Sequence, residues 1–155
     1  MGAGGNAMRK QYLNPTTLHD PRFYTHAVSV SGGGKLVCVA GQVSYDRDGI
    51  AFGRGDMHAQ AEQVFKNVGH ALRAAGAGWG DVIKMNAYMV GMSPERVNEF
   101  REVRARHLDS KQLPASTLVG VERLVHEDLL LEVEVVAAVA VAPRQRAAAR
   151  RRRRR

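Results

Sequence analysis

Residues 113–140 read LPASTLVGVERLVHEDLLLEVEVVAAVA, and this stretch decides the fold. It predicts a loop at Pro114, a short strand, a charged turn and a long apolar strand over 129–140. Glu132 and Glu134 point to one face of the long strand and the apolar residues beside them to the other, because strand side chains alternate. Either this carboxylate face meets solvent, or it lines a cavity.

The composition predicts a single soluble domain. The chain has 155 residues and 45% of them are hydrophobic, which is enough for one core. No stretch approaches the roughly 18 consecutive apolar residues of a membrane helix, and the first residues lack a secretory signal. We therefore expect a cytoplasmic protein without membrane contact. Met1 and Met8 are both candidate start residues.

The excess positive charge gathers at the C-terminus. Eight of the 23 basic residues are arginines within 144–155, so the remaining 15 balance the 15 acidic residues. A block of like charges predicts a disordered tail over 143–155. Such a tail binds nucleic acid weakly, by counterion release, and does not inform the function of the folded body.

The N-terminal part predicts an arm and a hairpin. Residues 1–20 lack periodicity and predict a loose arm ahead of a domain over 21–142. Residues 27–31 and 35–43 read as two strands, and the glycines at 32–34 as the turn of a β-hairpin between them.

Two helices and a strand follow. Asp56 is a good N-cap for a helix over 57–75 that ends at Gly76, and its apolar residues repeat at three and four positions. Residues 81–90 predict a strand whose Lys84, Asn86 and Tyr88 share one face. Ser93 and Pro94 begin a second helix.

Two helices cover only one face of a sheet of about five strands. The apolar run 36–40 faces both sides, so it should be covered on both, with Cys38 as a buried thiol. The simplest cover for the second face is another copy of the chain, because most soluble oligomers are symmetric.

The sequence holds none of the strong chemical motifs. It lacks HExxH, paired CxxC, Gly-x-Ser-x-Gly and a phosphate loop, and its six histidines have no chelating spacing. We predict neither a metal nor a cofactor.

Seven short motifs, taken in order, resemble the Rid family, also called the YjgF/YER057c/UK114 family. They are Phe23-Tyr24, Val39-Ala40-Gly41-Gln42, AQAEQVFKNVGHALRAAG over 59–76, DVIKMNAYMV over 81–90, Val97-Asn98, Leu113-Pro114-Ala115-Ser116 and Leu131-Glu132-Val133-Glu134.

The resemblance implies a fold and an activity. The fold is a chorismate-mutase-like α+β fold, a mixed sheet with two helices on one face, packed as a homotrimer with ligand clefts between subunits. The activity is hydrolysis of reactive enamines and imines, released by pyridoxal-phosphate enzymes, to a 2-oxo acid and ammonia. The family protein itself needs no cofactor for this metabolite damage control.

The resemblance also implies site residues. Glu132 matches the acid that orients water and Tyr24 the tyrosine near the cleft, so both are predicted to be catalytic. Gly41 and Asn98 match substrate-binding positions.

One position departs from the family. The family's deaminases have an arginine that grips the substrate carboxylate where this chain has Ser116, followed by Thr117. A serine cannot replace the charge or the fork of arginine, whose contact with a carboxylate contributes about 1.5 to 3 kcal/mol. We therefore expect an altered substrate preference, and Arg123 is a candidate substitute cation.

Two other functions stay open. The cleft could hold a small metabolite through the hydroxyls of Ser116 and Thr117 without turnover. Alternatively, the chain is an RNA-binding or endoribonuclease-type translation inhibitor, helped by the arginine tail.

Overall fold

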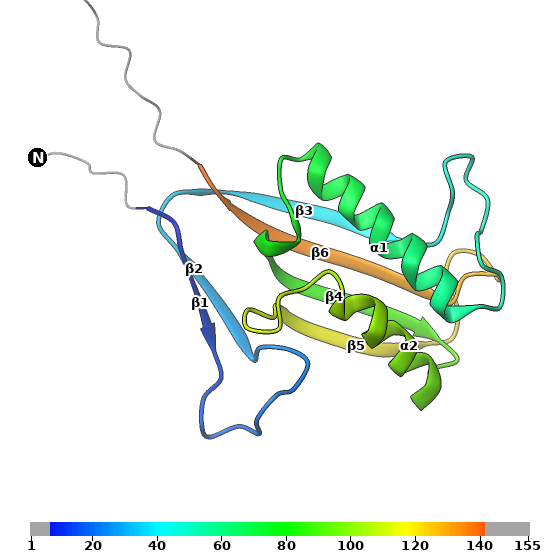
Figure 1. Ribbon diagram of the computed structural model, residues 1–155, viewed down its shortest axis with the longest axis horizontal. Coiled ribbons are helices and arrows are strands. Elements are labelled where there is room, and N and C mark those ends of the chain that lie inside the picture. Colours follow the sequence, from blue (N-terminus) through cyan, green and yellow to red (C-terminus); the bar gives the residue numbers. More distant parts are fainter. Residues whose placement is uncertain (1–6, 142–155) are drawn as a thin grey trace, which may run out of the picture.

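A computed structural model describes residues 7–141 (Figure 1). The predicted arginine tail and the choice between Met1 and Met8 involve residues outside this range. Within it, no helix is long and apolar enough to cross a membrane. The elements in chain order are β1 (Arg9–Leu13), β2 (Ala27–Ser31), β3 (Gly34–Gln42), α1 (Met57–Ala74), the 3-10 turn η1 (Trp79–Asp81), β4 (Val82–Val90), α2 (Pro94–Ala105), β5 (Ala115–Val121) and β6 (Leu131–Ala140).

The main sheet has four strands in the order β3-β6-β4-β5. The long strand β6 lies between β3 and β4 and is antiparallel to both, while β4 and β5 are parallel and joined through α2. The sheet is therefore mixed, as predicted, and the 113–140 stretch supplies β5 at one edge and β6 in the interior.

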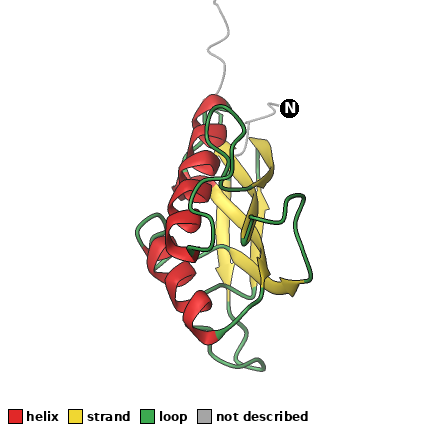
Figure 2. Cartoon of the chain, turned by 90° about the vertical axis from the view of Figure 1, so that its right-hand side faces the viewer, coloured by secondary structure: helices red, strands yellow, loops and turns green. Residues whose placement is uncertain are grey.

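Both helices cover the same face of this sheet (Figure 2). The α1 stripe is buried, with Val64, Phe65, Val68 and Leu72 at 0% exposure, and it packs on residues such as Val133 of β6. This arrangement confirms the predicted α+β fold with two helices on one face.

The helix ends follow the predicted capping residues. The Asp56 carboxylate accepts a hydrogen bond from the Ala59 backbone N–H at 2.9 Å, and Gly76 adopts a φ of +67° after α1. The Ser93 hydroxyl accepts one from the Arg96 backbone N–H at 3.3 Å, directly before Pro94. Local sequence therefore fixes where both helices begin.

Two predictions for the N-terminal part are wrong. Residues 9–13 are not a loose arm, because they pair with β2 as the antiparallel strand β1. The ammonium of Lys10 holds this strand to η1 through the Gly80 carbonyl at 3.2 Å. The predicted hairpin does not form either: β2 pairs with β1, and β3 pairs with β6. The strand β3 therefore pairs with the long apolar strand β6 and not with β2.

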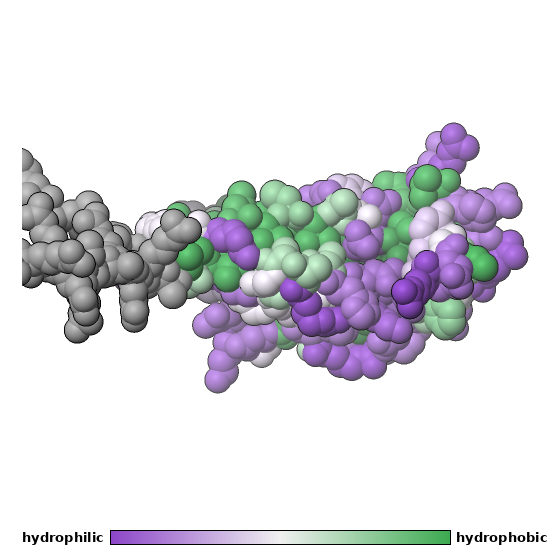
Figure 3. Space-filling view, turned by 90° about the horizontal axis from the view of Figure 1, so that it is seen from above, coloured by the Kyte–Doolittle hydropathy of each residue, from purple (hydrophilic) through white to green (hydrophobic). Residues whose placement is uncertain are grey.

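The second face of the sheet is open in the single chain. Val37 and Val39 are buried under the helices, but Leu36 is 65% exposed and Cys38 is exposed, so the prediction of a buried thiol is wrong for one copy. Apolar and hydrophilic areas lie side by side on the surface seen from above (Figure 3). The alternation of β6 places Glu132 and Glu134 on this open face.

Candidate functional site

Glu132 and Gly41 lie against each other where β6 meets β3. The pairing of these strands shifts register between Val39 and Gln42, which places Gly41 in an irregular part of the edge strand. A Cβ added to Gly41 would lie 2.7 Å from the carboxyl carbon of Glu132. Because residue 41 is a glycine, the Glu132 carboxylate can occupy the space that a side chain at residue 41 would fill.

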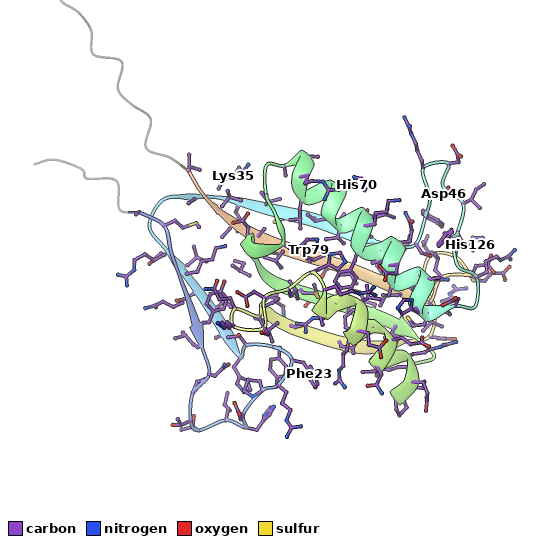
Figure 4. The ribbon with its side chains drawn as sticks, viewed as in Figure 1. Phe23, Lys35, Asp46, His70, Trp79 and His126 are labelled. Atoms are coloured by element: carbon purple, nitrogen blue, oxygen red, sulfur yellow. The ribbon has the colours of Figure 1, made fainter. Side chains whose placement is uncertain are left out.

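A cavity of about 940 Å³ extends from this pair toward α1. We call it the α1 groove: residues 41–47, except Ser44, line one side, the α1 residues Gln63, Lys66, Asn67, His70, Ala71 and Ala74 line the other, and Val125 and Glu132 complete it. His70 on α1 and Asp46 on the loop after β3 show the position of its two walls (Figure 4).

Asn67 fastens the loop wall of the α1 groove to the helix. Its amide nitrogen donates hydrogen bonds to the carbonyls of Val43 and Tyr45 at 2.9 and 2.8 Å. The Gln63 side chain donates to the Asn67 amide oxygen at 2.9 Å. These bonds hold the loop against α1 and so fix the position of the loop wall.

A second, smaller cavity of about 360 Å³ also includes Glu132. Tyr88, Arg123, Leu124 and Glu134 are among its lining residues. Glu132 therefore lies where the two cavities meet, and the candidate cation Arg123 lies on the side that also holds Glu134.

Glu134 has partners that fix its charge. Its Oε1 accepts hydrogen bonds from the Asn86 amide at 2.7 Å and from the Tyr88 hydroxyl at 3.0 Å. These bonds lower the pKa of Glu134, first through Asn86, and the bond to Glu134 raises the pKa of Tyr88. Glu132 makes no side-chain hydrogen bond within residues 7–141, so it is the carboxylate free to meet a water or a ligand. The shared face of Lys84, Asn86 and Tyr88 in the sequence was the signal for this network.

Tyr24, Ser116 and Thr117 gather at the other edge of the sheet. The Thr25 backbone N–H donates to the Pro114 carbonyl at 3.1 Å, which places Tyr24 beside the start of β5. The Tyr24 hydroxyl shares a hydrogen bond with His19 Nε2 at 2.7 Å. Tyr24 is therefore held by a neighbouring imidazole.

Ser116 and Thr117 point to opposite faces of β5. Ser116 is in register with the buried Met85, on the side of the helices, whereas Thr117 is in register with Asn86 on the open face. The Thr117 hydroxyl accepts a hydrogen bond from the Lys84 ammonium at 2.9 Å. Only Thr117 therefore faces the same side as the two carboxylates.

Asn98 is exposed on α2 and lines neither of the cavities that contain Glu132. Its helix does contact the loop of Tyr24, since the Arg101 guanidinium lies 4.1 Å from the centre of the Phe23 ring. Because β3 and β5 are opposite edges of the sheet, one copy brings together Gly41 and Glu132 but keeps Tyr24 and Ser116 apart from them.

The side chains of residues 7–141 include no group of three or more histidines, cysteines or carboxylates arranged to hold a metal ion. The site of one copy is thus a carboxylate, Glu132, between two cavities on an open sheet face.

The mixed sheet with two helices on one face is shared with solved structures. A Rid family protein of Yersinia pestis, YyfB, superposes with a TM-score of 0.74 at 31% identity, over 84% of this chain and 98% of that one. A YjgF/YER057c/UK114 family member from Mycobacterium tuberculosis gives a TM-score of 0.56 at 32% identity, over 75% and 86%.

The sequence comparisons agree. Residues 17–139 match the family described as Endoribonuclease L-PSP. A RutC family protein of Synechocystis is 33% identical over 118 residues, which cover 74% of this chain and 84% of that protein. The chain therefore belongs to the Endoribonuclease L-PSP family, the Rid or YjgF/YER057c/UK114 family.

Proposed function

We propose that this protein is a Rid-like hydrolase of reactive enamines and imines that works as a homotrimer in the cytoplasm. The observation that carries the proposal is the unengaged Glu132 carboxylate, seated over Gly41 at the junction of two cavities. A carboxylate without a fixed partner is suited to act as a general base toward water, and such help is typically worth about a hundredfold to ten-thousandfold.

The proposed reaction begins with water. Glu132 accepts a proton from a water molecule as the water oxygen bonds to the C=N carbon, and the imine nitrogen takes up a proton. Glu132 then returns its proton to the amino nitrogen of the resulting carbinolamine. The C–N bond breaks as the hydroxyl group loses its proton to the group that had protonated the imine nitrogen, so that a ketone and ammonia form. The net change is the addition of one water and the release of one ammonia.

We propose that Tyr24 of a second copy assists the departure of ammonia. Tyr24 lies at the β5 edge of the sheet, whereas Glu132 lies on β6 next to the β3 edge, so we assign this role to the tyrosine of a neighbouring subunit. The exposed apolar side chains of the open face, such as Leu36, support an assembly in which that face is covered.

The test is ammonia release from freshly generated 2-iminobutanoate and 2-aminoacrylate. We expect Glu132→Gln to lose at least about a hundredfold of the activity while keeping the assembly of the wild type. Glu122→Gln, in the exposed turn after β5, is the matched control and should be unaffected. An unchanged rate in Glu132→Gln would remove this carboxylate from the mechanism.

Ser116→Arg is the second variant of this test, because the family's deaminases have an arginine at this place. If the variant gains activity on these two imino acids, the native substrate does not present its carboxylate to residue 116. If wild type and variant are both inactive, binding of a metabolite without turnover becomes the better account. The RNA-binding or endoribonuclease alternative predicts instead that a chain ending at Pro143 loses RNA binding.

A further inference from the structure

The α1 groove has two cationic side chains, Lys66 and Arg47, whose charges are not paired with any residue in the described part of the chain. Lys66 lines the groove from α1, and Arg47 lines it from the opposite wall. Within residues 7–141, neither Lys66 nor Arg47 takes part in an ion pair or a side-chain hydrogen bond. Their charges are therefore available to a ligand.

The acidic side chains of the groove are placed differently. Asp46 is directed into its own loop, where its Oδ1 accepts hydrogen bonds from the backbone N–H groups of Asp48 and Ile50, both at 2.9 Å. Glu132 lies at the Gly41 end. The groove thus has the Glu132 carboxylate at one end, Lys66 on its α1 wall and Arg47 on the opposite wall.

The rigidity of the groove favours binding. The Asn67 and Gln63 bonds hold the loop against α1 before a ligand arrives, so little ordering is needed when one binds. The volume of about 940 Å³ is far larger than the smallest imino acids require.

The smaller cavity is the less favourable place for an anion. Arg123 lines it, but so do Glu132 and Glu134. The Asn86 and Tyr88 bonds keep Glu134 ionised, and two carboxylates repel a third anion at short range.

We propose that the α1 groove binds a carboxylate or phosphate of the substrate that is remote from the reacting carbon, through Lys66 and Arg47, while the C=N group lies at Glu132. The substrate class is an imine or enamine with a distal acidic group. This inference rests on the proposed hydrolase function and adds to it a specificity determinant on α1 and its facing loop.

The test uses two isomeric keto acids as stable stand-ins for the product. In 4-oxopentanoate the carboxylate is remote from the ketone, and in 2-oxopentanoate it is adjacent, at equal charge and formula. Calorimetry on the full chain should show 4-oxopentanoate binding about tenfold or more tightly. Nonspecific attraction to the arginine tail affects both isomers alike, so the ratio of their two affinities measures the contribution of the α1 groove.

Lys66→Gln and Arg47→Gln should each weaken binding of 4-oxopentanoate by about fivefold or more and leave 2-oxopentanoate almost unchanged. Both side chains are exposed, so the variants should keep the melting temperature of the wild type. Lys111→Gln, an exposed lysine outside the groove, is the control and should bind both isomers like the wild type.

Equal affinity for the two isomers, no binding of 4-oxopentanoate, or a loss in Arg123→Gln that Lys66→Gln and Arg47→Gln do not show would each overturn the inference. Ammonia release is measured separately. If the isomer ratio and its dependence on Lys66 hold but no imine is hydrolysed, the groove stands and the hydrolase proposal fails.

Discussion

The carboxyl group of Glu132 occupies the space that a side chain on residue 41 would fill. Gly41→Ala therefore forces the carboxylate to move, although the fold around it need not change. We expect the rate of ammonia release to fall about tenfold to a hundredfold, because a displacement of about 1 Å at a reacting group costs this much. Steady-state kinetics with thermal melting checks the prediction.

Gly80→Ala is the control for this substitution. A Cβ at Gly80 has no heavy atom within 4 Å, so the same chemical change there should leave the rate unaltered. Full activity in Gly41→Ala would show that the Glu132 carboxylate does not need its position beside residue 41 for catalysis.

The hydrogen bond between Tyr24 and His19 gives a second prediction. If Tyr24 donates a proton in the reaction, Tyr24→Phe should lower ammonia release about tenfold or more, while Tyr12→Phe in β1 should not. His19→Phe removes the partner of the hydroxyl at 2.7 Å and should lower the rate without changing the assembly. Equal rates of ammonia release in wild type and His19→Phe would contradict a role for this pair.

A third prediction concerns stability in acid. Bonds from Asn86 and Tyr88 lower the pKa of Glu134 in the folded state. A carboxylate with a lowered folded pKa adds stability above its unfolded pKa, about 4.3, and this contribution is lost as the pH falls through the folded pKa. The side chain is only partly buried, so the effect should be small.

The comparison is the urea midpoint of wild type and Glu134→Gln at pH 7 and pH 3.5. The wild type should lose more stability between these two pH values than the variant, and Glu122→Gln should behave like the wild type. Parallel losses in wild type and Glu134→Gln would show that the network around Asn86 does not favour the ionised form.

Much of the fold follows from local sequence. The caps at Asp56 and Ser93 and the alternation in β6 are local signals, and each gave the correct element. The pairing of β2 was mispredicted, since the glycines at 32–34 favour a turn equally well when the chain continues into another sheet. The partner of β3 depends on which other strands the whole chain offers for pairing. Here that partner is the apolar strand β6, which is far away in the sequence.

The site was less accessible to sequence reasoning. Resemblance supplied Glu132 and Gly41, and the structure explains their proximity through the irregular edge of β3. Lys66 was missed because it lies on the polar face of α1, where periodicity predicts only solvent. Its relation to Arg47 depends on the loop fastened by Asn67, and no local pattern encodes that contact.

The final prediction concerns what covers the open face. Leu36 is 65% exposed on β3, and a large apolar side chain at the centre of an interface contributes strongly to association. Leu36→Lys should therefore shift the protein from an oligomer to the monomer in light scattering, because it places an unpaired charge in the contact. Ile50→Lys is a matched control, since Ile50 is 64% exposed but lies on the loop after β3. A wild-type monomer, or the same dissociation in both variants, would contradict an assembly through this face. If Leu36→Lys dissociates and also loses ammonia release, the result supports a site that needs residues from two copies.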